Sequence, residues 1–195
     1  MAESNNSKIL QSSFYEIDIL EIGGHHKGKR GKDSENKQPT LLILSTLEDN
    51  NYPQYVKLHT LPNYKGEPIE EYLKEKCLFD PTIVINCDRD KAFFCLNKLA
   101  QLENSVVDYT KENHKLKWLN TFTGNIQSNI NHLYRLVKKR DLPLFLSEQE
   151  WRINHRYSGK RIMDKVKKYI SMSTPVTFKQ ITNSVLAYEK QFLSA

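Results

Sequence analysis

The sequence predicts an α/β fold in which a mixed five-stranded sheet is flanked by helices. Three strand patterns come first along the chain, and two more follow, each reached through a predicted helix. Strands joined by tight turns pair antiparallel, whereas a strand reached through a helix can run parallel to its neighbour. The chain has 195 residues, 38% hydrophobic and 27% charged. This is the size and composition of one globular domain with a single core.

The first three strands are predicted at residues 14–22, 40–47 and 53–60. The first, FYEIDILEI, alternates apolar and acidic residues and ends at Gly23-Gly24, before a basic loop. The second, TLLILSTL, is a continuous apolar run typical of a buried central strand. The third, PQYVKLHT, alternates with period two after a group of turn-forming residues, so the three strands are expected to form a meander.

Helices connect the remaining strands. A helix is predicted to begin at residues 66–68, where Pro68 suits the first turn. The apolar run at 82–86 predicts the fourth strand, and residues 90–100 have the apolar spacing of a helix. A short fifth strand is predicted at 105–107, which contains two consecutive valines.

The C-terminal part of the chain is predicted to be helical. Helical spacing runs from about residue 118 to 139 and again over 142–155. Two shorter helical patterns follow within 160–192 and are separated at Pro175. The expected organisation is an N-terminal tail at 1–13, an α/β core at 14–140, and a helical extension of the same domain at 141–195.

The composition favours a cytoplasmic protein with polyanionic partners. The net charge is +6, and the basic residues gather in segments 25–37 and 135–168. No apolar stretch approaches the ~18 residues of a membrane span, and the N-terminus lacks the apolar segment of a secretory signal. Cys77, Cys87 and Cys95 show no CxxC spacing and are expected to be reduced thiols.

Two aspartates lie where a carboxylate suggests a functional role. Asp18 lies within the first predicted strand between apolar residues, and Asp88 closes the fourth. In the predicted sheet these strands are neighbours, so both carboxylates could bind one metal ion. Two Mg²⁺ ions about 3.5–4 Å apart can activate a water or a 3′-hydroxyl at a phosphodiester. Two alternatives stay open: Asp88 could cap the following helix, and Asp18 could face solvent together with Glu16.

Some other polar and aromatic residues have simpler explanations. His25-His26 has no cysteine or histidine partner at metal-ligand spacing, so a solvated loop near phosphates is expected. Trp151 is expected to anchor the core rather than to stack on a base. The segment HHKGKRGK lacks the spacing of a nucleotide-binding loop, so nothing indicates the use of ATP.

Three motifs, in order along residues 14–185, resemble those of insertion-sequence transposases of the Asp-Asp-Asn branch, relatives of the Merlin elements. The first is YEIDILEIGGHHKGKRGK, and the second is IVINCDRDKAFFCL, with its aromatic at Phe93. The third opens with Trp118-x-Asn120-Thr121 and ends with Arg-x-Asn-x-Arg at Arg152, Asn154 and Arg156.

This resemblance implies an RNase H-like fold and a DDE-type catalytic core at 14–140. It implies that Asp18, Asp88 and Asn120 are the catalytic residues and bind Mg²⁺ or Mn²⁺, as two ions. Asn120 takes the place that most related transposases give to a glutamate; its amide oxygen can still bind a metal, but without charge.

The resemblance also implies that DNA, both element ends and target, is the partner of the chain. The residues expected to bind DNA phosphates are Lys27, Lys29, Arg30, Arg152 and Arg156. A homo-oligomer in the active complex and a nucleoid-associated cytoplasmic location are further expectations.

The chain departs from the family pattern at three places. Ile19 follows the first aspartate where the family usually has a glutamate, and Gln127 stands where a lysine is often found. The chain also starts close to the first catalytic strand, which predicts a truncated copy without an N-terminal DNA reader. The alternatives are therefore a DNA-binding remnant without catalysis and a nuclease of the same fold that cuts without joining.

Overall fold

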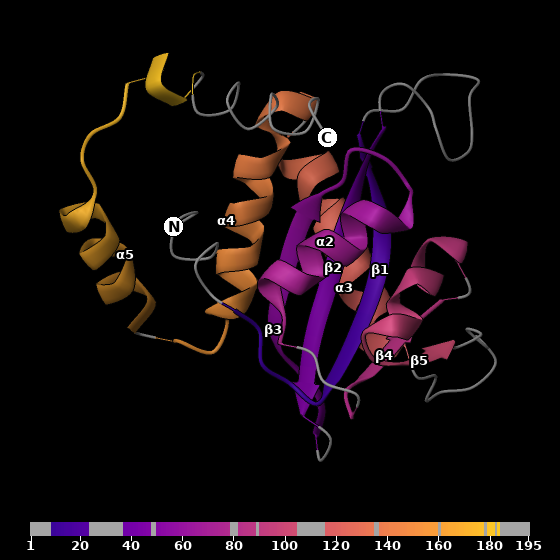
Figure 1. The fold of residues 1–195 in the computed structure, drawn as a ribbon. Helices are drawn as coiled ribbons and strands as arrows, with labels where there is room; N and C mark the ends of the chain where they lie inside the picture. The colour runs from indigo at the N-terminus through magenta and orange to yellow at the C-terminus, as the bar shows by residue number, and fades with distance from the viewer. Residues whose placement is uncertain are drawn as a thin grey trace.

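The computed structural model of the chain contains a five-stranded mixed sheet with helices on both faces (Figure 1). The strands are β1 (Phe14–Gly23), β2 (Lys37–Leu47), β3 (Asn50–Thr60), β4 (Val84–Cys87) and β5 (Gln101–Asn104). The α-helices are α2 (Gly66–Lys76), α3 (Lys117–Ser128), α4 (Leu142–Asn154) and α5 (Arg161–Met172). Shorter helical segments are η1 (Lys91–Lys98), η2 (Asn129–Leu133) and η3 (Lys139–Asp141).

The structure describes most of the chain. The described residues are 9–23, 37–47, 50–78, 82–88, 90–104, 116–134, 137–159, 161–177, 179–181 and 183. Within them, no helix is long and apolar enough to cross a membrane.

The strand order is β3-β2-β1-β4-β5. The first three strands pair antiparallel, while β4 runs parallel to both β1 and β5. This confirms the predicted fold class, a mixed sheet consistent with an RNase H-like fold. It also confirms that the strand carrying Asp18 lies next to the strand that ends before Asp88.

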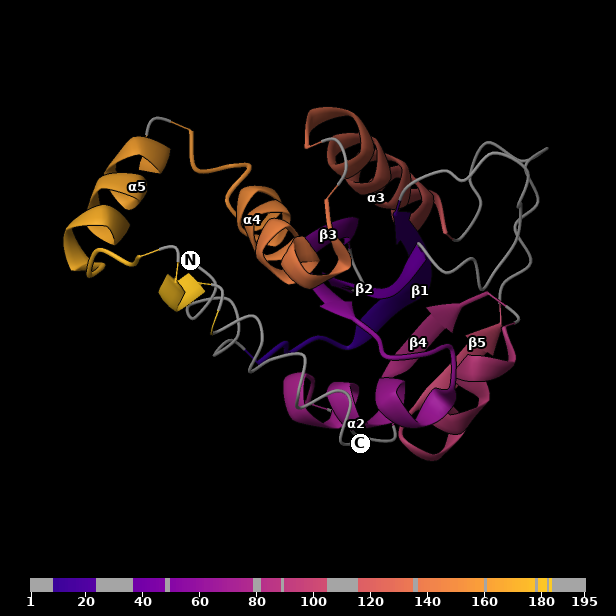
Figure 2. The same cartoon turned by 90° about the horizontal axis from the view of Figure 1, so that it is seen from above.

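Alternation along β1 sends its side chains into two separate cores. Tyr15 and Ile17 are buried on the face covered by α2 and η1. Leu20 and Ile22 are buried on the opposite face, against α3, η2 and α4. Figure 2 shows α2 on one side of the sheet and α3 and α4 on the other. Because successive side chains of a strand point to opposite faces, both layers are specified by one strand.

Two elements differ from their predicted form. The helix expected to run from 118 to 139 without a break is wrong: α3 ends at Ser128, and η2 follows as a π-helical turn. This turn buries Ile130 in the same core as α3. The helix expected at 90–100 is the 3₁₀ helix η1, which begins after Asp90.

The fifth strand is also not where the sequence pattern places it. The predicted segment 105–107 lies outside the described residues, and the strand beside β4 is Gln101–Asn104. This short polar strand is held by main-chain pairing with β4 in continuous register from Val84↔Gln101 to Cys87↔Asn104. Main-chain pairing needs no β-branched side chains, so the amino-acid composition of residues 101–104 does not predict a strand there.

Leu10, in the segment predicted as a tail, belongs to the folded core. It is 1% exposed and forms an isolated parallel bridge with Cys77. Its carbonyl also accepts a hydrogen bond from the Tyr15 hydroxyl at 3.1 Å. The ordered packing therefore begins before β1.

Helix α4 covers the outer edge of β3. Val56 donates its N–H to Asn154 Oδ1 at 2.7 Å, and Asn154 Nδ2 donates to the Val56 carbonyl at 2.9 Å. Two residues further along β3, Leu58 donates its N–H to Glu150 Oε2 at 3.1 Å. The side chains of α4 thus replace a sixth strand and block the edge against pairing with another chain.

We expect Asn154→Leu to lower the free energy of unfolding by about 2–3 kcal/mol. The buried N–H and carbonyl of Val56 would both lose their partner, and an unpaired buried polar group costs ~1–3 kcal/mol. Urea unfolding measures the change. The matched control is Asn125→Leu on the exposed surface of α3, for which a change within ~0.5 kcal/mol is expected. Equal losses in the two variants would contradict the edge role of Asn154.

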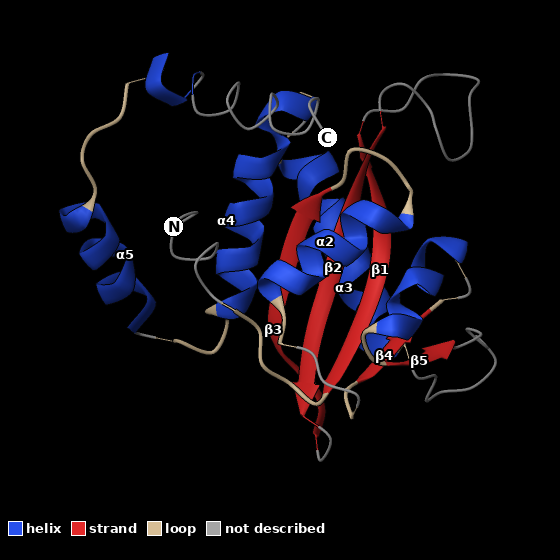
Figure 3. Ribbon diagram, viewed as in Figure 1, coloured by secondary structure: helices blue, strands red, loops and turns tan. Residues whose placement is uncertain are grey.

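Helix α5 stands apart from the sheet. None of its residues is buried, and it lies beyond α4, away from the strands (Figure 3). An aromatic contact connects it to α4: the rings of Tyr169 on α5 and Trp151 on α4 have centroids 6.1 Å apart. Trp151 itself is 4% exposed, which confirms that it anchors the core.

Candidate active site

Asp18 projects from β1 toward α3. Its neighbour Ile17 belongs to the core under α2, so Asp18 lies on the other face of the strand, with Leu20 and Ile22. The side chain is half-buried. Its Oδ1 accepts the N–H of Ile19 at 2.7 Å, and its Oδ2 accepts the hydroxyl of Thr123 at 3.4 Å. Glu16, on the same face of β1, is 4% exposed, so the alternative in which Asp18 and Glu16 face solvent together is wrong.

Asp88 follows directly on the end of β4 and is exposed. The β1–β4 register ends with Ile17 opposite Cys87, so its continuation by one residue sets Asp18 opposite Asp88. Oδ1 of Asp88 accepts the N–H of Asp90 at 2.9 Å, while Asp90 itself caps η1 by accepting the N–H of Ala92 at 3.0 Å. The helix-cap role considered for Asp88 is thus taken by Asp90.

Negative charge gathers at this end of the two parallel strands. The thiol of Cys87, at the last paired position of β4, has its pKa raised to about 12, first by burial and then by the charges of Asp88, Asp18 and Asp90. All three carboxylates therefore lie near enough to act on one buried group. This end of the two strands is therefore negatively charged.

Asn120 lies in the first turn of α3. The helix begins at Lys117 with Leu116 as its N-cap residue, so Asn120 does not cap it. The side chain is half-buried, and its Nδ2 is buried without a hydrogen-bond partner among the described residues. A buried amide without a partner is costly, so it points to a polar group that the site is built to receive.

Helix α3 runs alongside β1 and is attached to it by three side chains. The N–H of Leu119 is bound by Glu16 at 3.2 Å, and Thr123 donates to Asp18 one turn later. Gln127 then donates from Nε2 to the carbonyl of Glu21 at 3.4 Å. Helical spacing puts Asn120, Thr123 and Gln127 on one stripe of α3, so the helix presents Asn120 on the flank that also faces Asp18.

Glu16 is a site residue that the sequence pattern did not reveal. It is 4% exposed, and burial raises the pKa of its carboxyl to about 7, while the N–H of Leu119 acts in the opposite direction. Leu119 lies in the first turn of α3, where the N–H groups have no partner within the helix and the helix dipole is positive. Glu16 therefore supplies the cap that Leu116 lacks and fixes the end of α3 that carries Asn120.

The predicted phosphate-binding residues fall into three groups. Lys27, Lys29 and Arg30 lie outside the described residues. Arg152 is exposed on α4 and pairs with Glu148 one turn earlier, Nη2 to Oε1 at 2.7 Å. Arg156 is half-buried, and its guanidinium donates to the carbonyls of Ile153 and Pro53.

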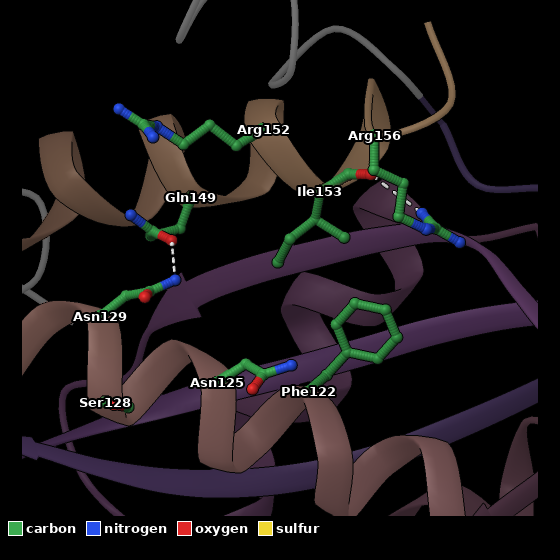
Figure 4. A pocket seen from close by; sticks show the side chains of 8 residues that line it. All are labelled: Phe122, Asn125, Ser128, Asn129, Gln149, Arg152, Ile153 and Arg156. Atoms are coloured by element: carbon green, nitrogen blue, oxygen red, sulfur yellow. Dashed lines mark hydrogen bonds between the residues drawn. The ribbon is translucent and has the colours of Figure 1, made fainter. Parts of the chain in front are cut away.

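A groove between α3 and α4 is lined by Arg152 and Arg156, the two arginines of the Arg-x-Asn-x-Arg segment (Figure 4). Asn129 and Gln149 close one end through a 3.1 Å hydrogen bond, and Phe122 faces Ile153 across the middle. Arg152 extends away from this contact. The lining residues are Phe122, Asn125, Ser128, Asn129, Gln149, Arg152, Ile153 and Arg156. The groove thus combines two basic side chains with the apolar surface of Phe122 and Ile153, on the flank of α3 opposite to Asn120.

The donor chemistry of the predicted site fits a hard divalent cation. Among the described residues, no group of three or more histidine, cysteine, aspartate or glutamate side chains is arranged to hold a metal. The predicted set instead combines two carboxylates with one amide, and Mg²⁺ and Mn²⁺ accept both kinds of oxygen. If the amide group of Asn120 rotated so that its two end atoms exchanged places, its oxygen would lie where the unpartnered Nδ2 now lies.

The cysteines do not contribute to this site. Cys77, Cys87 and Cys95 are all free, and burial raises the pKa of each thiol. Raised pKa values keep the thiols protonated and poorly nucleophilic near neutral pH. No disulfide joins these three cysteines.

Comparison with known proteins identifies a transposase family. A family model described as the ISXO2-like transposase domain matches residues 14–154, nearly three quarters of the chain. The match spans β1 to α4 and therefore includes every element that positions Asp18, Asp88 and Asn120. No curated protein sequence matches the chain.

Proposed function

Because the chain belongs to the ISXO2-like transposase domain family, we propose that it cuts and joins DNA strands through a DDE-type site of the Asp-Asp-Asn kind. The observation that carries this proposal is the parallel pairing of β1 with β4, whose register ends with Ile17 opposite Cys87, one residue before Asp18 and Asp88. We also propose that the transposases of the Merlin elements are more distant relatives of the chain.

Asp18, Asp88 and Asn120 would hold Mg²⁺ or Mn²⁺, as two ions. When bound, such ions polarise the scissile phosphodiester and lower the pKa of an attacking water or 3′-hydroxyl. The two carboxylates supply the negative charge of the site, whereas Asn120 contributes an oxygen without charge. Three ligands with only two charges neutralise the cations less completely, which leaves more positive charge to act on the phosphate.

The remaining residues of the site act by positioning. Thr123 donates to Asp18 and limits the rotation of its carboxyl group. Glu16 binds the first turn of α3 and so sets the height of Asn120 above the sheet. These contacts favour a site that is preorganised before DNA arrives, which reduces the cost of assembling the transition state.

A second candidate function, DNA binding without cleavage, is favoured by Gln127. The position at which the family often has a lysine holds an uncharged side chain that donates to the Glu21 carbonyl of β1. A phosphate would gain no ionic contact there. The copy could then bind DNA as a remnant, and a nuclease that cuts without joining is a third outcome of the same experiment.

The experiment that tests the function is an assay of strand cleavage and joining. The substrate is a DNA duplex made from the sequences flanking the gene that encodes this chain, incubated with Mg²⁺, with Mn²⁺, or with EDTA. Metal-dependent nicks together with joined products support the transposase. Nicks without joined products support the nuclease, and binding without nicks under every metal condition supports the remnant.

DNA binding is expected to depend steeply on salt. Each phosphate contact contributes roughly −0.9 to the slope of log affinity against log salt concentration. Arg152→Ala should make the slope less steep by about 1, because Arg152 is exposed beside the groove between α3 and α4. Fluorescence anisotropy at several salt concentrations measures the slope.

The matched control for Arg152→Ala is Lys74→Ala. Lys74 pairs with Glu70 one turn away on α2, as Arg152 pairs with Glu148 on α4, but α2 covers the other face of the sheet. The control should leave the slope unchanged. If both variants shift the slope equally, the effect reports net charge rather than a DNA surface at α4.

A further inference from the structure

Exposed aromatic rings gather where the start of β3, the start of α3 and the end of α4 meet. Tyr52 is 40% exposed and Tyr157 69% exposed. The Tyr52 ring lies 4.4 Å from the half-buried Trp118 ring and 6.1 Å from the Tyr157 ring, measured between centroids. Large exposed aromatics that contact one another outside the core usually belong to a binding surface.

Arg156 holds this cluster together. Its guanidinium lies 4.5 Å from the centre of the Tyr157 ring and 5.9 Å from that of Tyr52. Its hydrogen bonds to the carbonyls of Ile153 and Pro53 keep it in place. Interaction between the two phenol groups raises the pKa of Tyr52 and lowers that of Tyr157. The rings are therefore fixed in orientation while remaining open to solvent.

The cluster and the candidate active site share one turn of α3. Trp118 and Asn120 both belong to the first turn of α3. Helical geometry turns them to opposite flanks of that turn, Trp118 toward β3 and Asn120 toward β4. If a DNA phosphate lay at Asn120, the same strand would have to cross only the first turn of α3 for one of its bases to reach the aromatic rings.

We propose that Tyr52, Trp118 and Tyr157, held around Arg156, form an aromatic platform that stacks on an unpaired DNA base next to the cleaved phosphate. Every base has an aromatic face, so stacking on such rings binds single-stranded DNA without reading its sequence. The cation beneath the rings adds attraction for a polyanion. The inference deepens the proposed function, since it adds a single-strand subsite to the same DNA-handling surface.

The test separates base stacking from phosphate binding and from catalysis. A labelled oligodeoxythymidine is compared with an abasic oligonucleotide of equal length, by fluorescence anisotropy in EDTA. The wild-type protein should bind the thymidine strand more tightly than the abasic strand. Tyr157→Ala should weaken thymidine binding about tenfold and leave abasic binding unchanged, because only the base stacks.

Two variants serve as controls. Tyr157→Phe keeps the ring and should keep the preference for bases. Phe94→Ala removes another exposed aromatic, 50% exposed on η1, which packs with the core on the other face of the sheet; this change should have no effect. Since Trp151 is buried, quenching of tryptophan emission by the oligonucleotide should come from Trp118.

Three results would overturn the proposal. One is equal affinity of the wild-type protein for thymidine and abasic strands. Another is loss of affinity for both strands in Tyr157→Ala, which would indicate a phosphate contact. The third is a Tyr157→Ala variant that no longer self-associates in sedimentation yet binds DNA normally, which would make the cluster a protein interface. Because EDTA prevents cleavage, a protein that never cuts DNA could still pass this test.

Discussion

Asp18→Asn and Asp88→Asn are each expected to abolish metal-dependent cleavage while the protein stays folded. Each change removes one of the two negative charges of the site, and an amide restores none of that charge to a divalent cation. Loss of several kcal/mol of transition-state stabilisation corresponds to a fall in rate on the order of 10³ or more. The measurement is the single-turnover rate of strand nicking with Mg²⁺ and with Mn²⁺.

The structure predicts that these variants remain stable. In Asp18→Asn the new amide oxygen could still accept the Ile19 N–H, and Asp88 is exposed. Asp164→Asn on the exposed surface of α5 is the matched control and should cleave like the wild-type protein. Full cleavage by either active-site variant would remove that aspartate from the mechanism.

Variants of Asn120 distinguish a catalytic role from a structural role of this residue, when cleavage and melting temperature are compared. Its buried Nδ2 has no partner among the described residues, so Asn120→Ala should not lower the melting temperature, although it removes a ligand. Asn120→Asp should retain metal binding and some cleavage, because a carboxylate replaces the amide oxygen. A variant Asn120→Ala that melts early yet cleaves normally would show that Asn120 is structural.

The second large effect is expected at a buried ion pair between the edge strand β3 and α4. Lys57 on β3 and Glu150 on α4 lie with Nζ and Oε1 3.4 Å apart, and their side chains are only 2% and 5% exposed. Burial lowers the pKa of Lys57 and raises that of Glu150, in both cases as the largest cause. Glu150 also binds the N–H of Leu58, so the pair joins α4 to the edge of the sheet.

Breaking this pair should cost about 3–5 kcal/mol, because one charge would remain buried without its counter-charge. Glu150→Gln is the informative change, since its amide oxygen can still accept the Leu58 N–H while the charge is lost. For a domain with ~5–15 kcal/mol of stability this is a severe loss. Urea unfolding at neutral pH measures it.

A double variant distinguishes charge burial from simple loss of contact. Lys57→Met combined with Glu150→Gln should recover most of the stability, since neither charge then remains in the core. The control pair is Lys74 and Glu70 on α2, which lie closer, at 2.7 Å, but whose side chains are 56% and 24% exposed. Lys74→Ala should cost no more than ~1 kcal/mol. A double variant as unstable as Glu150→Gln alone would refute this account.

Local patterns were sufficient for the elements whose side chains alternate or repeat. The strands at 14–22, 40–47, 53–60 and 82–86 were predicted because burial on one or both faces requires apolar residues at fixed spacing. The same reasoning failed for β5, a polar strand held by main-chain hydrogen bonds to β4. It failed again at Ser128, where an apparently continuous helical pattern changes from α-helix to a π-helical turn.

The candidate site was predictable only in part. Asp18 and Asp88 could be singled out because strand order alone brings them together. Glu16 could not, since an acidic residue in an alternating strand looks the same whether it faces water or a helix. Only the packing of α3 on β1 buries Glu16 and gives it the Leu119 N–H as a partner.

The sequence by itself determined the class of fold, the neighbouring strands that carry Asp18 and Asp88, and the resemblance that introduced Asn120. These depend on periodicity, chain order and motif, which are properties of short segments. The tertiary structure alone decided that Asn154 completes the edge of β3 and that Arg156 is held among tyrosine rings. Both residues belong to one basic motif, but hydrogen-bond partners about a hundred positions away in the chain set their roles. Such contacts arise only when α4 packs against the sheet, so no local pattern contains them.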